Sequence, residues 1–172
     1  MKKVLKITLI VCALGLVSFL GYKVTSGIQE KKEAANRLQT IPSFSFQTMD
    51  GNPFSKDNLK PNTPTVFIYF HSECDFCQHE ALSISENIEP FKNIQLLFIS
   101  TEPIESIENF SIEYNLNNQT NTKFLHDSTD SFSTQFDATS IPYLLIYDKN
   151  QKLIKKHKGQ YKAESILKLF QE

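Results

Sequence analysis

The sequence predicts an α/β domain in which a mixed β-sheet is covered by helices on both faces. Two apolar runs, residues 65–70 and 96–99, are typical of strands that are buried on both faces. Each run is followed by a segment whose apolar residues recur at helical spacing. Further along, two strand-like runs joined by residues 148–151 predict a hairpin, and a last helical segment follows it. Strand, helix, strand, helix, hairpin and helix is the order of a layered α/β domain.

The lead-in to the central strand carries turn and cap signals. Residues 43–48 alternate Phe44 and Phe46 with polar neighbours, as a half-buried strand does. The Asp-Gly-Asn-Pro run at 50–53 predicts a turn, and Ser55 is placed to cap a short helical turn. The remaining predicted elements are a helix over 80–91, a strand over 94–100, a helix over 104–114, a short edge strand over 124–126, a helix capped by Ser128 or Thr129 and ending at Phe136, strands over 143–147 and 152–158, and a helix over 162–170.

Length and composition indicate one domain with accessory segments. The chain has 172 residues, and domains average about 100 to 150 residues. Hydrophobic residues make up 40%, with 14 Phe among them, which is enough for a substantial core. The formal net charge of −1 comes from interspersed acidic and basic residues, so the chain lacks the basic footprint of a nucleic-acid-binding protein. Nucleic acid is therefore not an expected partner.

The N-terminus predicts a membrane anchor or a signal segment over residues 1–24. Three lysines lie within residues 1–6, and a largely apolar run follows over residues 7–22. The run lacks a small-residue A-x-A cleavage site, so we favour an anchor that crosses the membrane through residues 4–24. With so short a tail before it, the domain is expected on the periplasmic, extracytoplasmic side of the cell membrane. A signal that is cleaved, leaving a secreted domain, is the alternative.

Polar and charged residues over 25–40 predict a linker, either a short helix or a tether, and the domain is expected over 41–172. Cys12 lies inside the apolar run, where it is expected to act as a small hydrophobic residue rather than as a lipidated cysteine. The exported domain then has only Cys74 and Cys77, so its cysteines do not form a dense disulfide framework.

Cys74 and Cys77 have C-x-x-C spacing where a helix is predicted to begin after the central strand. At a helix N-terminus, free backbone N–H groups and the helix dipole stabilise a thiolate, the form that attacks disulfides. Cys77 lies one turn on, close enough to form a disulfide with Cys74. The alternative is half of a zinc site, since His71 and His79 flank the pair. That site needs four converging ligands, and His79 is about 200° around the helix axis from Cys77. No metal site is therefore predicted.

The order of these parts resembles the thioredoxin fold. A central strand ends in C-x-x-C, and Ile141-Pro142, a hairpin and a terminal helix follow later in the chain. Residues 44–55 resemble the extra N-terminal β-hairpin of membrane-anchored, TlpA-like thiol-disulfide oxidoreductases of the bacterial envelope. Glu80 matches the acidic position of their C-x-x-C-x-x-E pattern.

Three positions depart from that family pattern. Glu73 stands where a Trp usually precedes the first cysteine, and Asp75-Phe76 replaces an intervening pair that contains Pro. Leu82 occupies the position of a Pro that commonly follows the glutamate. The fold and the reaction class survive these changes, whereas substrate identity and redox potential do not transfer.

The resemblance implies a thiol-disulfide oxidoreductase that needs no cofactor beyond its redox-active Cys74–Cys77 disulfide. The Cys74 thiolate attacks a substrate disulfide, Cys77 resolves the mixed disulfide, and Glu80 accepts the Cys77 proton. A cis peptide bond at Ile141-Pro142 would face Cys74 and offer the Ile141 backbone to the substrate. Expected partners are disulfide- or thiol-bearing proteins and an upstream thiol electron donor.

Several alternatives remain open from the sequence. Glu80 could be a solvated helix charge, and Pro142 a plain strand-start proline. Acidic neighbours raise a thiol pKa, so the residues beside the first cysteine favour a reductase. A peroxidase of the related peroxiredoxin group would need Thr or Ser where His71 stands. A copper-delivery protein of the same fold would pair the two cysteines with a distant histidine, His126 or His157.

Overall fold

The computed structural model describes residues 2–171, without the side chains of residues 2–14 and 17. The chain divides into two compact units, Met1–Arg37 and Leu38–Glu172. The first unit is formed by one helix, α1 (Lys2–Arg37), so the predicted linker is helical as far as Arg37. Within the described part of the chain, no helix is long and apolar enough to cross a membrane. Most side chains of the apolar run over 7–22 lie outside the described residues.

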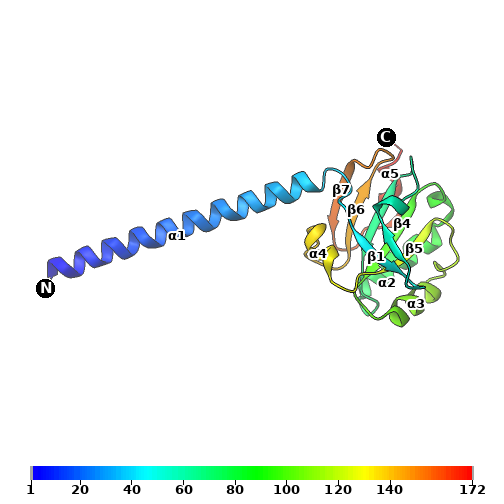
Figure 1. Ribbon diagram of the computed structural model, residues 1–172, viewed down its shortest axis with the longest axis horizontal. Coiled ribbons are helices and arrows are strands. Elements are labelled where there is room, and N and C mark those ends of the chain that lie inside the picture. Colours follow the sequence, from blue (N-terminus) through cyan, green and yellow to red (C-terminus); the bar gives the residue numbers. More distant parts are fainter. Residues whose placement is uncertain (1, 172) are drawn as a thin grey trace. The chain divides into compact units, whose positions relative to one another are not determined.

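The domain that begins at Leu38 is built on a seven-stranded sheet with the order β2-β1-β5-β4-β3-β6-β7 (Figure 1). The strands are β1 (Ser45–Thr48), β2 (Pro53–Ser55), β3 (Thr65–Tyr69), β4 (Gln95–Ser100), β5 (Thr122–His126), β6 (Tyr143–Tyr147) and β7 (Leu153–Lys158). The helices are α2 (Asp75–Glu86), α3 (Ile104–Glu113), α4 (Ser131–Gln135) and α5 (Ala163–Lys168), with short 3-10 turns at Lys56–Asn58 and Glu89–Phe91.

The sheet is mixed, as predicted. Strand β3 pairs in parallel with β4 and antiparallel with β6, so that Ile68 lies between Phe98 and Leu144. Strands β1 and β2 form the predicted N-terminal hairpin, and Ser55 caps the 3-10 turn that follows it. Strand β3 is therefore an interior strand, and pairing on both sides fixes the position at which the loop after it begins.

Three local predictions were wrong. Strand β5 is not an edge strand, because β1 pairs antiparallel with it and extends the sheet beyond it. The N-cap of α4 is Asp130 instead of Ser128 or Thr129. The Asp127 carboxylate accepts a backbone N–H of the first turn, that of Phe132, at 2.7 Å, as a capping side chain would. The helix expected over 80–91 ends at Glu86 and gives way to a 3-10 turn.

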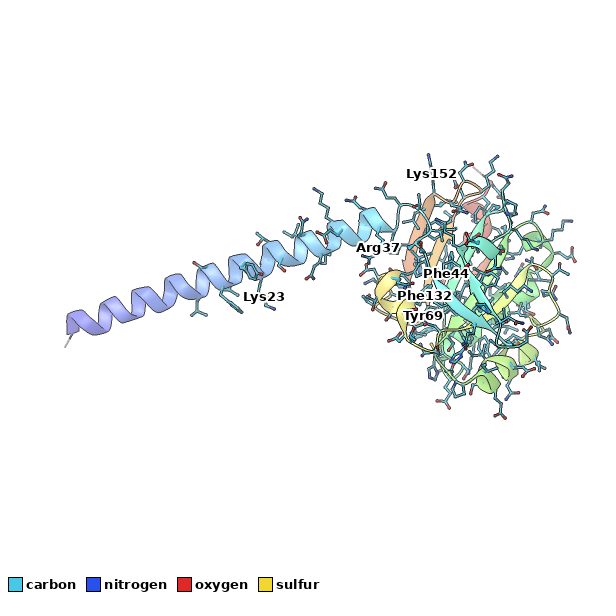
Figure 2. The ribbon with its side chains drawn as sticks, in the orientation of Figure 1. Lys23, Arg37, Phe44, Tyr69, Phe132 and Lys152 are labelled. Carbon is cyan, nitrogen blue, oxygen red and sulfur yellow. The ribbon has the colours of Figure 1, made fainter. Side chains whose placement is uncertain are left out.

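Alternate side chains of β3 face two separate cores. Val66 and Ile68, together with Phe70 just after the strand, pack with apolar residues of α2, α3 and α5. Phe67 and Tyr69 pack on the other face, against α4 and the segment before β1. This second core is aromatic: Tyr69 stacks on Phe132 at 5.0 Å between ring centroids, and Figure 2 shows both in the same part of the domain as Phe44. Burial on both faces makes β3 a rigid support for the loop that follows it.

Candidate active site

The loop after β3 places Cys74 at the start of α2. Cys74 is the N-cap residue, with extended backbone angles (φ −88°, ψ 112°) and no side-chain capping bond. Its carbonyl accepts the N–H groups of Cys77 and Gln78 at 2.9 and 3.0 Å. The Cys74 side chain is half-buried, whereas Cys77 is 1% exposed, and both thiols are free. The first cysteine is therefore the one that a second molecule can reach.

The Cys77 thiol lies in surroundings that disfavour its charged form. Burial is the largest cause of its raised pKa, and the neighbouring Cys74 thiol and the Glu80 carboxylate raise that pKa further. A hydrogen bond with the backbone of His71 acts in the opposite direction and lowers it. Cys77 therefore needs a partner to take its proton before it can act as a nucleophile.

Glu80 is a buried carboxyl group on the same helix. It is 1% exposed, and its Oε1 atom accepts the backbone N–H of Tyr161 at 2.9 Å. Its Oε2 atom is buried without a hydrogen-bond partner. Burial raises the pKa of Glu80 from 4.5 to about 8, although the Tyr161 bond lowers it. Because residues three apart share one helix face, this buried carboxyl group with a raised pKa lies on the face that carries Cys77.

The Ile141–Pro142 peptide bond is cis, as predicted. It immediately precedes β6, whose first residue, Tyr143, pairs with Tyr69 at the end of β3. The cis peptide bond is thus at the end of the sheet from which the Cys74 loop starts. The Ile141 side chain is 39% exposed there.

Sequence reasoning missed Glu102, which follows β4. Its Oε2 atom accepts the Ser72 N–H at 2.7 Å and the Ser100 hydroxyl at 3.0 Å. Its Oε1 atom accepts the Ser72 hydroxyl at 2.6 Å and lies 3.5 Å from Nδ1 of His71. One signal in the sequence could have found it: Glu102 lies two residues after the buried strand β4, and β4 pairs with β3, the strand that leads to the cysteines.

The four histidines lie on different elements of the domain. His71 lies beside Glu102, while His79 is exposed on α2. His126 ends β5, and the His157 ring stacks on Tyr161 at 4.4 Å between centroids. Among the residues that the structure describes, no group of three or more His, Cys, Asp or Glu side chains is arranged to hold a metal ion.

A family model described as the AhpC/TSA family matches residues 38–156, more than half of the chain and almost the whole domain. The chain belongs to the AhpC/TSA family. This places the cysteine pair and the sheet that supports it in a family of redox proteins with a thioredoxin-like fold. None of the curated protein sequences matches this AhpC/TSA family member significantly.

Solved structures share the fold of this AhpC/TSA family member at low sequence identity. A secreted Mycobacterium tuberculosis disulfide oxidoreductase, described as homologous to E. coli DsbE, is 21% identical with a TM-score of 0.62, covering 80% of this chain and 98% of its own. StoA from Bacillus subtilis is 17% identical with a TM-score of 0.59, covering 77% and 98%. Peroxidoxin BcpB from M. tuberculosis is 16% identical with a TM-score of 0.65, covering 77% and 94%. These likenesses establish the thioredoxin-like fold.

Proposed function

We propose that this protein is a thiol-disulfide oxidoreductase that exchanges disulfides with other proteins through Cys74 and Cys77. The observation that carries the proposal is the division of the pair at the start of α2. Cys74 is accessible, while Cys77 is buried behind it. On the same helix Glu80 supplies a buried carboxyl group whose pKa is raised to about 8. An accessible nucleophile, a protected resolving thiol and a proton acceptor are the parts that disulfide exchange needs.

The reaction proceeds in two exchanges. The Cys74 thiolate attacks one sulfur of a substrate disulfide, forming a mixed disulfide and releasing the other substrate sulfur as a thiolate. Cys77 then loses its proton to Glu80 and attacks the Cys74 sulfur, which releases the second substrate thiolate. The substrate gains two electrons and, from solvent, two protons, and the protein is left with a Cys74–Cys77 disulfide. An upstream thiol donor restores the dithiol by the reverse chemistry.

The direction of reduction is favoured by the burial of Cys77. Burial raises the pKa of the Cys77 thiol, so this site does not stabilise Cys77 as a thiolate. Strong oxidants of this kind are oxidising because their reduced form is stabilised as a thiolate. This site therefore suits a reductase, with the Ile141 backbone beside the cis bond as the contact for the substrate chain.

The apolar run over residues 7–22 supports a further part of the proposal, that the protein works at the cell envelope with its domain outside the cytoplasm. Residues 4–24 would hold it in the cell membrane, and its partners would be envelope proteins that carry thiols or disulfides. The alternative is release of the domain after cleavage of residues 1–24.

Peroxide reduction is a second candidate, because the AhpC/TSA match and the likeness to peroxidoxin BcpB favour it. In that reaction the Cys74 thiolate attacks a peroxide, releases water or an alcohol, and becomes a sulfenic acid. Cys77 then condenses with the sulfenic acid to form the disulfide and a second water. The residue three positions before Cys74 is His71, so this chain lacks a hydroxyl group at that position for binding the peroxide.

The two candidates separate in one set of assays on the full chain in mild detergent. Turnover of insulin disulfides with a thiol reductant should exceed turnover of hydrogen peroxide. Cys74→Ser should abolish the turnover of insulin disulfides. Cys77→Ser should accumulate a mixed disulfide with insulin. Faster peroxide than disulfide turnover would support the peroxidase, and absence of both activities would refute the proposal.

A further inference from the structure

Glu102 holds the loop that separates β3 from the cysteines. The side chain is 9% exposed and follows β4, the parallel neighbour of β3. Both of its oxygens bind Ser72, one through the backbone N–H at 2.7 Å and the other through the hydroxyl at 2.6 Å. Bonds this short to a carboxylate belong to the charge-assisted class, which is stronger than neutral hydrogen bonding. Glu102 thus connects the Ser72 loop to β4.

The same loop contacts both cysteines through its backbone. The His71 carbonyl accepts the Cys74 N–H at 3.1 Å. The His71 backbone also makes the hydrogen bond that lowers the pKa of Cys77. On the other side, the Gln78 side chain donates to the Ser72 carbonyl at 2.8 Å and ties the loop to α2. A displacement of the loop would therefore move the hydrogen-bond partners of both sulfur-bearing residues.

The groups around Glu102 donate to both of its carboxylate oxygens. Ser72 offers an N–H and a hydroxyl, and the Ser100 hydroxyl donates at 3.0 Å. An ionised carboxylate has only acceptors, so all these donors are satisfied at once. A glutamine has the same shape, but its NH₂ group would face the Ser72 hydroxyl, which would then have to accept instead of donate, and the negative charge that strengthens all three bonds would be lost. The Ser72 loop therefore depends on the negative charge of Glu102 and not only on the volume of its side chain.

We propose that Glu102 is a positioning residue for the cysteine pair. Its carboxylate anchors Ser72, and the anchored loop keeps the His71 backbone against Cys77, so that Cys77 can be deprotonated and resolve the mixed disulfide. This inference rests on the proposed disulfide exchange and adds a residue that contacts neither sulfur. Glu80 and Glu102 then act on the same step by different routes, one as proton acceptor and the other through the loop.

The test is the ratio of two rate constants in the full chain, formation and resolution of the mixed disulfide with a chromogenic aromatic disulfide. Glu102→Gln should lower the resolution rate about tenfold, as expected when charge-assisted bonds that position a reacting group become neutral ones. Formation, which depends on the accessible Cys74, should change less than twofold. The pH at which resolution becomes half-maximal should move upward, because Cys77 loses a contact that lowers its pKa.

Four variants separate positioning from simple packing. Glu102→Asp keeps the charge and should restore part of the resolution rate. Ser72→Ala removes one of the two bonds to the loop and should give an intermediate effect. Ser100→Ala removes a Glu102 partner outside the loop and should lower the resolution rate less than Ser72→Ala does. Glu105→Gln makes the same chemical change at an exposed site on α3 and should match wild type.

The outcomes are decisive in either direction. An unchanged ratio and pH profile in folded Glu102→Gln and Ser72→Ala would overturn the inference, and so would an equal loss in Ser100→Ala. If Glu102→Gln does not fold, the ratio and pH profile of Ser72→Ala decide alone. Absence of exchange by the wild type would instead refute the proposed function.

Discussion

Replacement of Glu80 by Gln removes a buried charge and keeps the shape of the side chain. In the native domain the carboxyl group has a pKa of about 8, against an ordinary value of 4.5, because burial disfavours its ionised form. The folded state therefore holds a proton that the unfolded state has lost between these two pH values. Stability that depends on neutral Glu80 is fully present below pH 4.5 and is lost as the pH rises through 8.

The size of this effect follows from the two pKa values. Each pKa unit corresponds to about 1.36 kcal/mol, so the loss reaches about 3 kcal/mol at pH 7 and up to about 5 kcal/mol above pH 8. Glu80→Gln should therefore match wild type in free energy of unfolding near pH 4 and exceed it increasingly at higher pH. Urea denaturation of the reduced protein at pH 4, 7 and 9 measures this difference. Glu86→Gln, at an exposed position of the same helix, is the matched control and should show no such trend.

The same substitution should slow catalysis while it stabilises the fold. Resolution of the mixed disulfide needs removal of the Cys77 proton, and loss of the general base should slow this step by roughly 10- to 100-fold. In wild type, resolution should accelerate as the pH rises through about 8, because ionised Glu80 is the acceptor. That inflection should disappear in Glu80→Gln. Equal resolution rates for the two proteins between pH 6 and 8, or a stability difference that does not vary with pH, would refute the reasoning.

Three further predictions rest on burial and on the N-terminal segment. Alkylation of the reduced protein at limiting reagent should label Cys74 before Cys77, and mass spectrometry that found the opposite order would reverse their roles. Phe67→Ala should lower the free energy of unfolding by about 3 to 5 kcal/mol, because the ring is fully buried among aromatic side chains, while Phe76→Ala at a 62% exposed site should change it little in chemical denaturation. The full chain should sediment with membranes after cell fractionation, and a mature protein that begins near Gly27 in a soluble envelope fraction would contradict this.

Features that depend on neighbouring residues were predictable from the sequence. The strand over residues 65–70, the C-x-x-C pair at a helix start and the C-terminal hairpin all follow from local apolar pattern and turn residues, and the structure contains each of them. The cis bond before Pro142 was expected from a resemblance and is also present. The position of β5 was not predictable, since three apolar or half-buried residues do not reveal which strand will pair beside them.

The sequence by itself determined the type of fold and indicated the candidate cysteine pair, because spacing at a helix start and the periodicity of buried strands are local properties. Only the tertiary structure decided what surrounds those sulfurs. The Tyr161 N–H that binds Glu80 is 81 positions away in the chain, and Glu102 is 30 positions from Ser72. Such partners meet because the parallel pairing of β3 with β4 brings their C-terminal ends to one edge, and because α5 packs with α2. The pKa of a buried carboxyl group depends on this surrounding protein, which no local pattern specifies.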